Sequence, residues 1–500
     1  MKYGLIVILL LNLVVMGESS LLESVRSKDY PRIKTLLSEG ADPNVFQPDG
    51  STALHLAVFN GDSELVQWLI KADANANAVN RYGITPLWLA CRNGQASMVR
   101  MLLEAGADPQ VRQYGGQTPL MMAARSGALD TVQLLHERGA DIDAREGEGQ
   151  TAMMWAAAEG HAEVIGWLIE RGADFRTPLK GGFTPLFFAI REGRSEVVQM
   201  LLEAGADPNE AMKPERRFSR GVAKGMTALL MAVENGHFEI AMDLVRAGAR
   251  PNDQGAGYAA LHAMSWVRKP DHGEGVNGMP PPDTTGRLTS LEFVRKIVAL
   301  GAEINRPIEK SNGGLGALNK AGATPFLMAA KTADLPLLKL LFELGADASI
   351  KTRDEVTPLI AAAGLGTLAA GEVAGTESEV LEVLEWLIEI GQDVNAIDRN
   401  GETAMHAAAY KNLPRVVTFL ADHGARMEVW NQPDKHGWTP LLIAEGFRPG
   451  NFKPSFETIA ALHKVMLAGG ITPPPLTDPA GVNNSDFGPR ERKYTRKQNP

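Results

Sequence analysis

TPLWLACRNGQASMVRMLLEAGADPQVRQYGGQ, residues 85–117, is the stretch that decides the fold. The same frame starts again at Thr118, Thr151 and Thr184, each 33 residues after the previous start. A fixed period of this length is typical of proteins built by stacking one structural unit many times. The sequence therefore predicts an elongated array of similar units.

Each unit is predicted to be a pair of short helices. Thr85 is suited to cap a helix, because its hydroxyl can accept a hydrogen bond from a first-turn N–H, and Pro86 fits the first helical position. Residues 87–90 supply an apolar face, and residues 98–103 carry the buried stripe of a second helix. Gly106 then ends that helix, since glycine readily adopts the left-handed conformation.

A single unit is too small to fold alone. It offers about six aliphatic side chains worth roughly 1.5–3 kcal/mol each, whereas ordering the backbone costs about 1–2 kcal/mol per residue. Neighbouring units must supply the remaining stability, so the array is expected to fold as a cooperative stack.

The frame resembles the ankyrin-repeat family. Residues 52–57, TALHLA, match that family's T-P-L-H-x-A signature, and the resemblance extends over about nine-tenths of the chain. It implies an all-α solenoid of about twelve helix-turn-helix units, joined by β-turn or hairpin fingers, that binds proteins in a concave groove. The units begin at Ser19, Thr52, Thr85, Thr118, Thr151, Thr184, Thr227, Ala259, Thr324, Thr357, Thr403 and Thr439.

Three positions depart from the pattern, and one of them is Glu355, which replaces a turn glycine and predicts a less regular unit. Asp73 stands where Gly106 stands one unit later, and we expect it to adopt the left-handed region, which aspartate tolerates better than most residues. Ala259 replaces the capping threonine, so its unit is expected to be less regular.

Composition indicates an ordinary water-soluble chain of 500 residues, 44% hydrophobic and 22% charged. Its formal charge is −9, or −10 without residues 1–17, which disfavours nucleic acid as a partner. The single cysteine, Cys91, rules out a disulfide within the chain and is expected to be a buried apolar residue. No cofactor motif is present, and a monomer is expected.

The two ends of the chain differ from the array at residues 18–472. Residues 1–17 combine Lys2 with an apolar run at 5–16 and Gly17, which predicts a secretory signal and a periplasmic or secreted protein. The alternative is an N-terminal core helix. Phe456, Ile459, Leu462 and Val465 predict a last amphipathic helix. Residues 473–500 lack apolar periodicity and are predicted to be a disordered polar tail.

Four insertions interrupt the period, and long loops in a compact array are often functional. They lie at residues 209–226, 266–289, 306–323 and 364–378. On the family resemblance, the first and third lengthen fingers, whereas the second and fourth raise the opposite rim of the groove.

One loop contains residue types that support catalysis. Asp271, His272, Glu274 and Asp283 could bind a divalent metal or share a proton. The surrounding glycines and prolines give the loop no rigid frame, so a metal-dependent enzyme is the weaker interpretation. His55 and His406 occupy the signature histidine position, where the family uses the ring to bind backbone.

The family resemblance also assigns partner contacts to finger tips and to the ends of the first helices. Exposed tyrosine, phenylalanine and arginine commonly dominate interface energetics. These candidates are Arg81, Tyr82, Ile84, Arg92, Tyr114, Gln117, Arg125, Lys180, Phe183 and Arg191.

Two further groups leave the choice of role open. Arg216, Arg217 and Arg220 give one finger insertion a positive charge, which suits an anionic partner or a solvated loop. Trp266 is either a contact anchor or part of a helix core.

Taken together, these features favour an exported, non-catalytic scaffold that binds another protein, similar to the long ankyrin proteins that bacteria send across the inner membrane. The alternative is a periplasmic accessory protein that shields or positions an enzyme.

Overall fold

The computed structural model describes most of the predicted array as helix pairs. The chain divides into two compact units, residues 1–217 (unit 1) and 218–500 (unit 2). The described residues are 21–214, 224–271, 285–311, 318–368, 370–371, 373–448 and 453–475. Within these ranges the regular structure is helical, apart from isolated bridges such as the one between Phe46 and Thr52. The predicted all-α repeat fold is confirmed.

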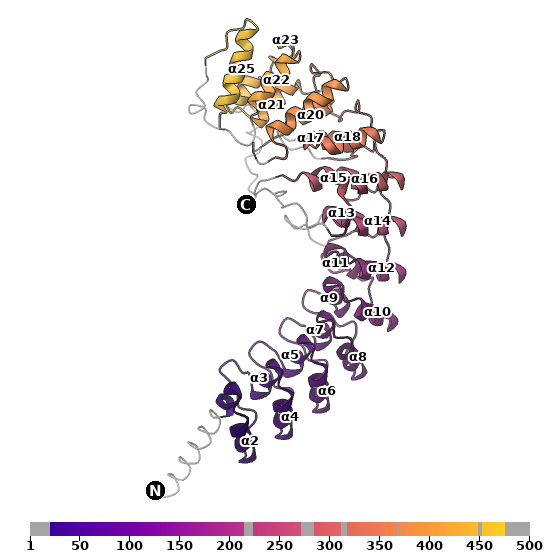
Figure 1. Ribbon diagram of the computed structural model, residues 1–500, viewed down its shortest axis with the longest axis vertical. Helices are drawn as coiled ribbons and strands as arrows, with labels where there is room; N and C mark the ends of the chain where they lie inside the picture. Colours follow the sequence, from indigo (N-terminus) through magenta and orange to yellow (C-terminus); the bar gives the residue numbers. More distant parts are fainter. Residues whose placement is uncertain are drawn as a thin grey trace, which may run out of the picture. The chain divides into compact units, whose positions relative to one another are not determined.

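Unit 1 consists of two rows of helices (Figure 1). The first helices of the repeats form the inner row, and each contacts the next. The inner row contains residues 21–27, α3 (Ala53–Phe59), α5 (Pro86–Arg92), α7 (Pro119–Arg125), α9 (Ala152–Glu159) and α11 (Pro185–Arg191). The outer row contains α2 (Tyr30–Ser38), α4 (Ser63–Lys71), α6 (Ala96–Glu104), α8 (Leu129–Glu137), α10 (Ala162–Glu170) and α12 (Ser195–Glu203).

Unit 2 has the same two-row arrangement, with longer connections. Its inner row contains α13 (Ala228–Glu234), α15 (Ala260–Arg268), α17 (Pro325–Lys331), α19 (Pro358–Ala362), α21 (Ala404–Lys411) and α24 (Pro440–Ala444). Its outer row contains α14 (Phe238–Arg246), α16 (Ser290–Ala299), α18 (Leu335–Glu343), α20 (Glu377–Glu389), α22 (Pro414–Asp422) and α25 (Phe456–Ala468). A short helix that the sequence did not predict, α23 (Met427–Trp430), precedes α24.

Threonine hydroxyls cap most of the inner helices as predicted, although Thr184 Oγ1 donates to Glu210 instead. Thr85 has an extended backbone, and its Oγ1 accepts the N–H of Trp88 at 3.2 Å. This bond satisfies one of the first-turn donors that the helix itself cannot pair. The same cap is made by Thr118, Thr151, Thr227, Thr324, Thr357 and Thr439.

Three histidines tie one repeat to the next. In His55, Nδ1 accepts the backbone N–H of Thr52 at 3.1 Å, and Nε2 lies 3.0 Å from the carbonyl oxygen of Ile84 in the following finger. His406 makes the equivalent contacts, which confirms the structural role predicted for both rings. His262 makes the same contacts at Ala259, in the unit that lacks its threonine. Burial lowers the pKa of His262 to about 4, which keeps this ring neutral.

A ladder of side chains also joins the fingers. Asn77 Oδ1 accepts the N–H of Asp108 at 2.8 Å, and its Nδ2 donates to the carbonyl of Gly106 at 2.8 Å. Asn252 and Asn395 bridge consecutive repeats of unit 2 in the same manner. These bonds satisfy the carbonyls at the ends of the outer helices, and they fix the spacing between repeats.

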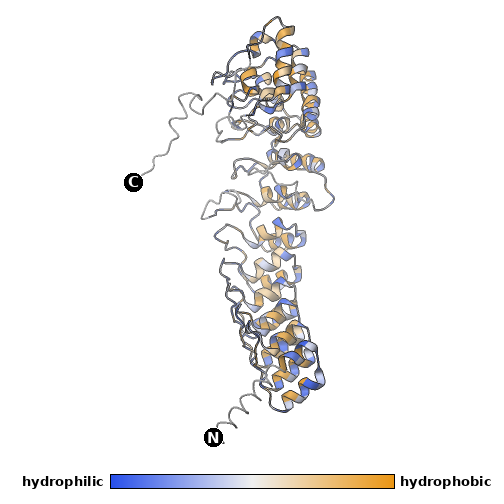
Figure 2. Ribbon diagram, turned by 90° about the vertical axis from the view of Figure 1, so that its left-hand side faces the viewer, coloured by the Kyte–Doolittle hydropathy of each residue, from blue (hydrophilic) through white to orange (hydrophobic). Residues whose placement is uncertain are grey.

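Apolar residues gather on the helices, whereas the fingers are mainly hydrophilic (Figure 2). Leu21 and Val25 are fully buried, so helical packing is already in place at the first described residues. Cys91 is also fully buried, as predicted. Asp73 adopts a φ of +64°, which confirms the left-handed conformation expected there.

The structure corrects three details of the prediction. Helix α15 extends to Arg268, so Trp266 is helical and the connection after it starts three residues later than predicted. Glu377 and Ser378 belong to α20 and not to the preceding insertion. Phe456, predicted to lie on the apolar stripe of α25, is 71% exposed, because Ile459, Leu462 and Met466 form the buried face.

Candidate protein-binding surface

A row of arginines lies at the ends of the inner helices of unit 1. Arg92, Arg125 and Arg191 are the last residues of α5, α7 and α11, and each stands seven residues after its capping threonine. All three side chains are exposed. The packed face of each helix is formed by earlier residues, so this repeat position faces solvent in all three helices.

Aromatic rings hold these arginines in place. The guanidinium of Arg125 lies 4.8 Å from the centre of the Trp155 ring, which belongs to the following repeat. Arg92 lies 5.6 Å from the ring centre of Trp88 in its own helix. A cation over an aromatic face gains about 0.5–1 kcal/mol at an exposed site, and the N–H groups at the edge of a stacked guanidinium can still donate hydrogen bonds.

Arg191 links the helix end to the finger before it. Its guanidinium lies 5.2 Å from the ring centre of Phe188 and 5.4 Å from that of Phe183. Phe183 precedes the capping residue of α11, and it packs against Phe188 with ring centres 5.2 Å apart. Two of the predicted site residues, Phe183 and Arg191, are therefore in contact.

The finger tips carry exposed aromatic residues. Tyr82 is 50% exposed and Tyr114 is 75% exposed. Asn80 Oδ1 accepts the N–H groups of Tyr82 and Ile84, which closes the tight turn. Gly83 has a φ of +75°, and a Cβ there would lie 2.7 Å from the backbone nitrogen of Tyr114, so only glycine allows the next finger to pack closely. The rigid turn presents Tyr82 to solvent.

The other predicted residues occupy varied environments. Arg81 is exposed and donates to the Tyr82 hydroxyl at 2.5 Å, and Lys180 is exposed. Ile84, Gln117 and Phe183 are half-buried. The remaining predicted site residues lie in unit 2 or outside the described residues.

Trp266 lies in unit 2, half-buried in α15, where its ring meets Tyr258 edge-on at 4.8 Å. This contact favours the helix-core interpretation of Trp266. Arg216, Arg217 and Arg220 lie outside the described residues.

Sequence reasoning missed part of this surface. Phe59 is 60% exposed at the same repeat position as the three arginines, and Phe46 is 70% exposed in the first described finger. The repeat alignment alone would have identified Phe59. The stacking of Arg125 on Trp155 depends on how adjacent helices pack, and the alignment does not show it.

The metal-site hypothesis gains no support from the residue that can be placed. Asp271 Oδ1 accepts the N–H of Ala374 at 2.9 Å. Its hypothesised co-ligands His272, Glu274 and Asp283 lie outside the described residues. In the part of the chain that the structure describes, no group of three or more histidine, cysteine or acidic side chains is arranged to hold a metal ion.

Stacked helix pairs with capped inner helices and projecting fingers define a repeat scaffold. Family models match this organisation over most of the chain. A model of ankyrin repeats in three copies matches residues 21–113, 120–212 and 372–451. Two further ankyrin-repeat models match residues 97–135 and 224–256. The chain belongs to the ankyrin-repeat family.

Similar proteins match shorter stretches. Potassium channel AKT1 from Oryza sativa subsp. indica is 37% identical over 73 residues, which is 15% of this chain and 7% of the channel. The probable 26S proteasome regulatory subunit p28 of Saccharomyces cerevisiae is 31% identical over 130 residues, 25% of this chain and 50% of that protein. This chain therefore covers at most half the length of either relative.

Proposed function

We propose that this protein is an exported, non-catalytic scaffold whose unit 1 binds an acidic segment of another protein. The observation that carries the proposal is the row formed by Arg92, Arg125 and Arg191, whose exposed guanidinium groups are stacked on aromatic rings. Arginine and tyrosine are the residue types that most often dominate protein interfaces. The ankyrin-repeat fold and the similarity to a proteasome regulatory subunit support a role in protein association.

The stacking favours carboxylate groups in the partner. A guanidinium fork forms paired hydrogen bonds with a carboxylate, and a stacked side chain loses less freedom on binding. Arg125 pairs with the exposed Glu159 at 3.3 Å, and Arg191 pairs with the exposed Glu192 at 2.9 Å. An exposed pair of this kind contributes at most about 1 kcal/mol, so a partner carboxylate can replace it.

Reversing charge in the row tests the proposal. The double variant Arg125→Glu with Arg191→Glu should reduce partner capture from the producing organism's extracellular or periplasmic fraction by at least about tenfold, because two attractions become repulsions. Arg138→Glu is the matched control, since Arg138 is an exposed arginine that follows the outer helix α8. Quantitative mass spectrometry of captured proteins gives the readout. Equal recovery by the double variant and the control would refute the role of the row.

Export rests on the N-terminal pattern alone, and a direct measurement decides it. Removal of residues 1–17 should leave a mature protein that lacks Lys2 and the apolar run after it. Intact-mass analysis of the protein from its native host measures this removal. A mature protein that still begins at Met1 would contradict export.

No helix among the described residues has the length and apolar character needed to cross a bilayer.

A further inference from the structure

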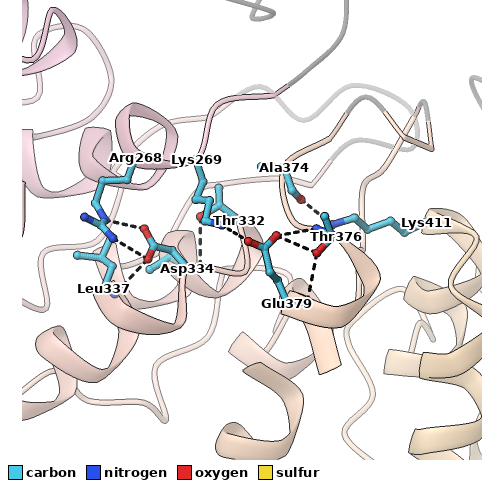
Figure 3. Close-up of polar contacts among 10 residues, drawn as sticks. Arg268, Lys269, Thr332, Asp334, Leu337, Ala374, Thr376, Glu379 and Lys411 are labelled. Carbon is cyan, nitrogen blue, oxygen red and sulfur yellow. Dashed lines mark hydrogen bonds and ion pairs between the residues drawn. The ribbon is translucent and has the colours of Figure 1, made fainter. Parts of the chain in front are cut away.

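Unit 2 contains a polar cluster that unit 1 lacks at the corresponding helix ends among the described residues. It forms where the connections after α15 and α19 meet the ends of α17 and α21 (Figure 3). Arg268 donates to both carboxylate oxygens of Asp334, at 2.6 and 3.0 Å, and Lys269 pairs with Glu379. These pairs join residues that are 66 and 110 positions apart in the sequence.

The peptide of Ala374 is held from both sides at the centre of this cluster. Asp271 Oδ1 accepts its N–H at 2.9 Å, and Lys411 Nζ donates to its carbonyl oxygen at 2.6 Å. The next residue, Gly375, is so tightly packed that a Cβ would lie 2.7 Å from the Cβ of Ala333. The same Cβ would lie 3.3 Å from Lys411 Nζ, so the amine lies against this packed backbone.

Two more lysines converge on the same carboxylate. Lys331 is the last residue of α17, and Lys320 comes from the finger before that helix, with its amine 5.8 Å from the ring centre of Trp266. Asp271 attracts the amines of Lys320, Lys331 and Lys411, whereas Lys331 is repelled by the other two. We call these three lysines with Asp271 the lysine cluster.

The lysine cluster has more positive than negative charge. Asp271 attracts all three amines, and Glu379, which also attracts Lys411, is engaged by Lys269. Within the described part of the chain, the amines of Lys320 and Lys331 donate to no protein acceptor. Burial lowers the pKa of both, and burial followed by repulsion from Lys331 lowers the pKa of Lys411 to about 8.

We propose that Lys320, Lys331 and Lys411 bind a small tetrahedral oxyanion of the phosphate or sulfate class. Each ammonium has three donors, and even Lys411 uses only one of them on Ala374. Charge-assisted hydrogen bonds to an oxyanion would offset both the desolvation of the amines and their mutual repulsion. Asp271 sets the geometry of the site and moderates its affinity.

Isothermal titration calorimetry of the full-length protein with sodium sulfate, in a sodium chloride background of constant ionic strength, tests the proposal. Lys331→Gln should weaken sulfate binding by at least about tenfold, because it removes a charged donor. Lys339→Gln, which changes an exposed lysine on α18, is the control and should leave binding unchanged. Equal affinities for Lys331→Gln and the wild type would overturn the proposal, as would the absence of sulfate binding by the wild type.

A second variant predicts a change of opposite sign. Asp271→Asn retains an oxygen that can accept the Ala374 N–H but removes the negative charge, so sulfate should bind more tightly by a few-fold to tenfold. A merely structural cluster would not gain affinity on losing this charge. Weaker binding by a folded Asp271→Asn protein would contradict the oxyanion site.

The dependence of binding on pH and on the size of the anion tests which ligand the lysine cluster binds. Sulfate keeps its charge between pH 6 and 9, so a change in its affinity over this range reports on the protein. The affinity should fall as the pH rises through about 8, because Lys411 loses its proton there. The other groups that act on this amine are Lys331, Asp271 and Glu379.

Comparing inorganic phosphate with glycerol phosphate as ligands distinguishes a site for free anions from a site that also accepts phosphate esters. Binding of phosphate but not of the ester assigns the site to free oxyanions, and binding of both assigns it to phosphate groups in general.

Discussion

The same repeat position has opposite environments in the two units. Seven residues after the start of each repeat, unit 1 has Arg26, Phe59, Arg92, Arg125 and Arg191, all exposed, together with the half-buried Ala158. At that position unit 2 has Glu234, Trp266, Lys331, Gly364, Tyr410 and Gly446. The four residues other than glycine are all half-buried or buried.

The length of the connection between the two helices of a repeat explains the difference. In unit 1 the inner helix passes into the outer helix through a short turn, which leaves its last side chain in solvent. In unit 2 the connections after α15 and α19 are longer, and their described parts pack over neighbouring helix ends through Asp271 and Ala374. One repeat frame therefore supports either a binding row or an enclosed polar cluster.

Removing a buried carboxylate from unit 2 should have the largest effect. Asp334 and Asp62 stand at the same repeat position, and each accepts a first-turn N–H of its outer helix, at 3.2 and 3.0 Å. Asp334 is fully buried and also pairs with Arg268. We expect Asp334→Ala to lower the free energy of unfolding by about 3–5 kcal/mol, and Asp62→Ala by about 1 kcal/mol.

Urea denaturation followed by circular dichroism measures both variants. Adding Arg268→Met to Asp334→Ala should recover part of the loss, because the second change removes the buried charge that the first leaves unpaired. Equal losses of unfolding free energy for Asp62→Ala and Asp334→Ala would show that the Arg268–Asp334 ion pair adds no stability beyond the helix cap. The two units would then not differ in stability at this repeat position.

Local chemistry explains how much of the fold could be predicted. The caps and the left-handed Asp73 depend on residues within one turn, so the sequence shows them directly. The Arg268–Asp334 and Lys269–Glu379 pairs depend on which distant loops converge, and the repeat period carries no such information. Likewise, the contact between the His262 ring and the carbonyl oxygen of Arg306 depends on how the next finger packs, which the repeat period does not show.

The candidate surface was predictable to a similar extent. The repeat position of Arg92, Arg125 and Arg191 indicated exposed cations, and all three are exposed. The position of Lys331 is the same, yet the structure half-buries it beside Lys320, because a finger insertion and a long connection lie next to it. Whether such a residue faces solvent or an interior is decided by insertions, whose conformation the sequence pattern does not specify.

A smaller effect is expected from a buried carboxyl in a finger of unit 2. Glu402 precedes the capping Thr403 and is 8% exposed, whereas unit 1 has half-buried glutamine at this position in Gln117 and Gln150. Burial, followed by repulsion from Asp398 and Asp434, raises the pKa of Glu402 from 4.5 to about 7. Between these values the unfolded chain releases a proton that the folded chain retains, so stability falls as the pH rises from about 4.5 to 7.

Glu402→Gln installs the residue type that unit 1 already uses, and it should remove this pH dependence. The variant keeps an oxygen that can accept from Asn400 Nδ2, which lies 3.3 Å from Glu402 Oε2. At pH 8 we expect a gain on the order of 3 kcal/mol at most in the free energy of unfolding, and little change at pH 4.5, where glutamate is already protonated in the folded state. Urea titrations at the two pH values measure the difference, with Glu428→Gln on the surface of α23 as the control. If the wild type and Glu402→Gln lose equal stability between these pH values, repulsion among the finger carboxylates does not distinguish unit 2 from unit 1.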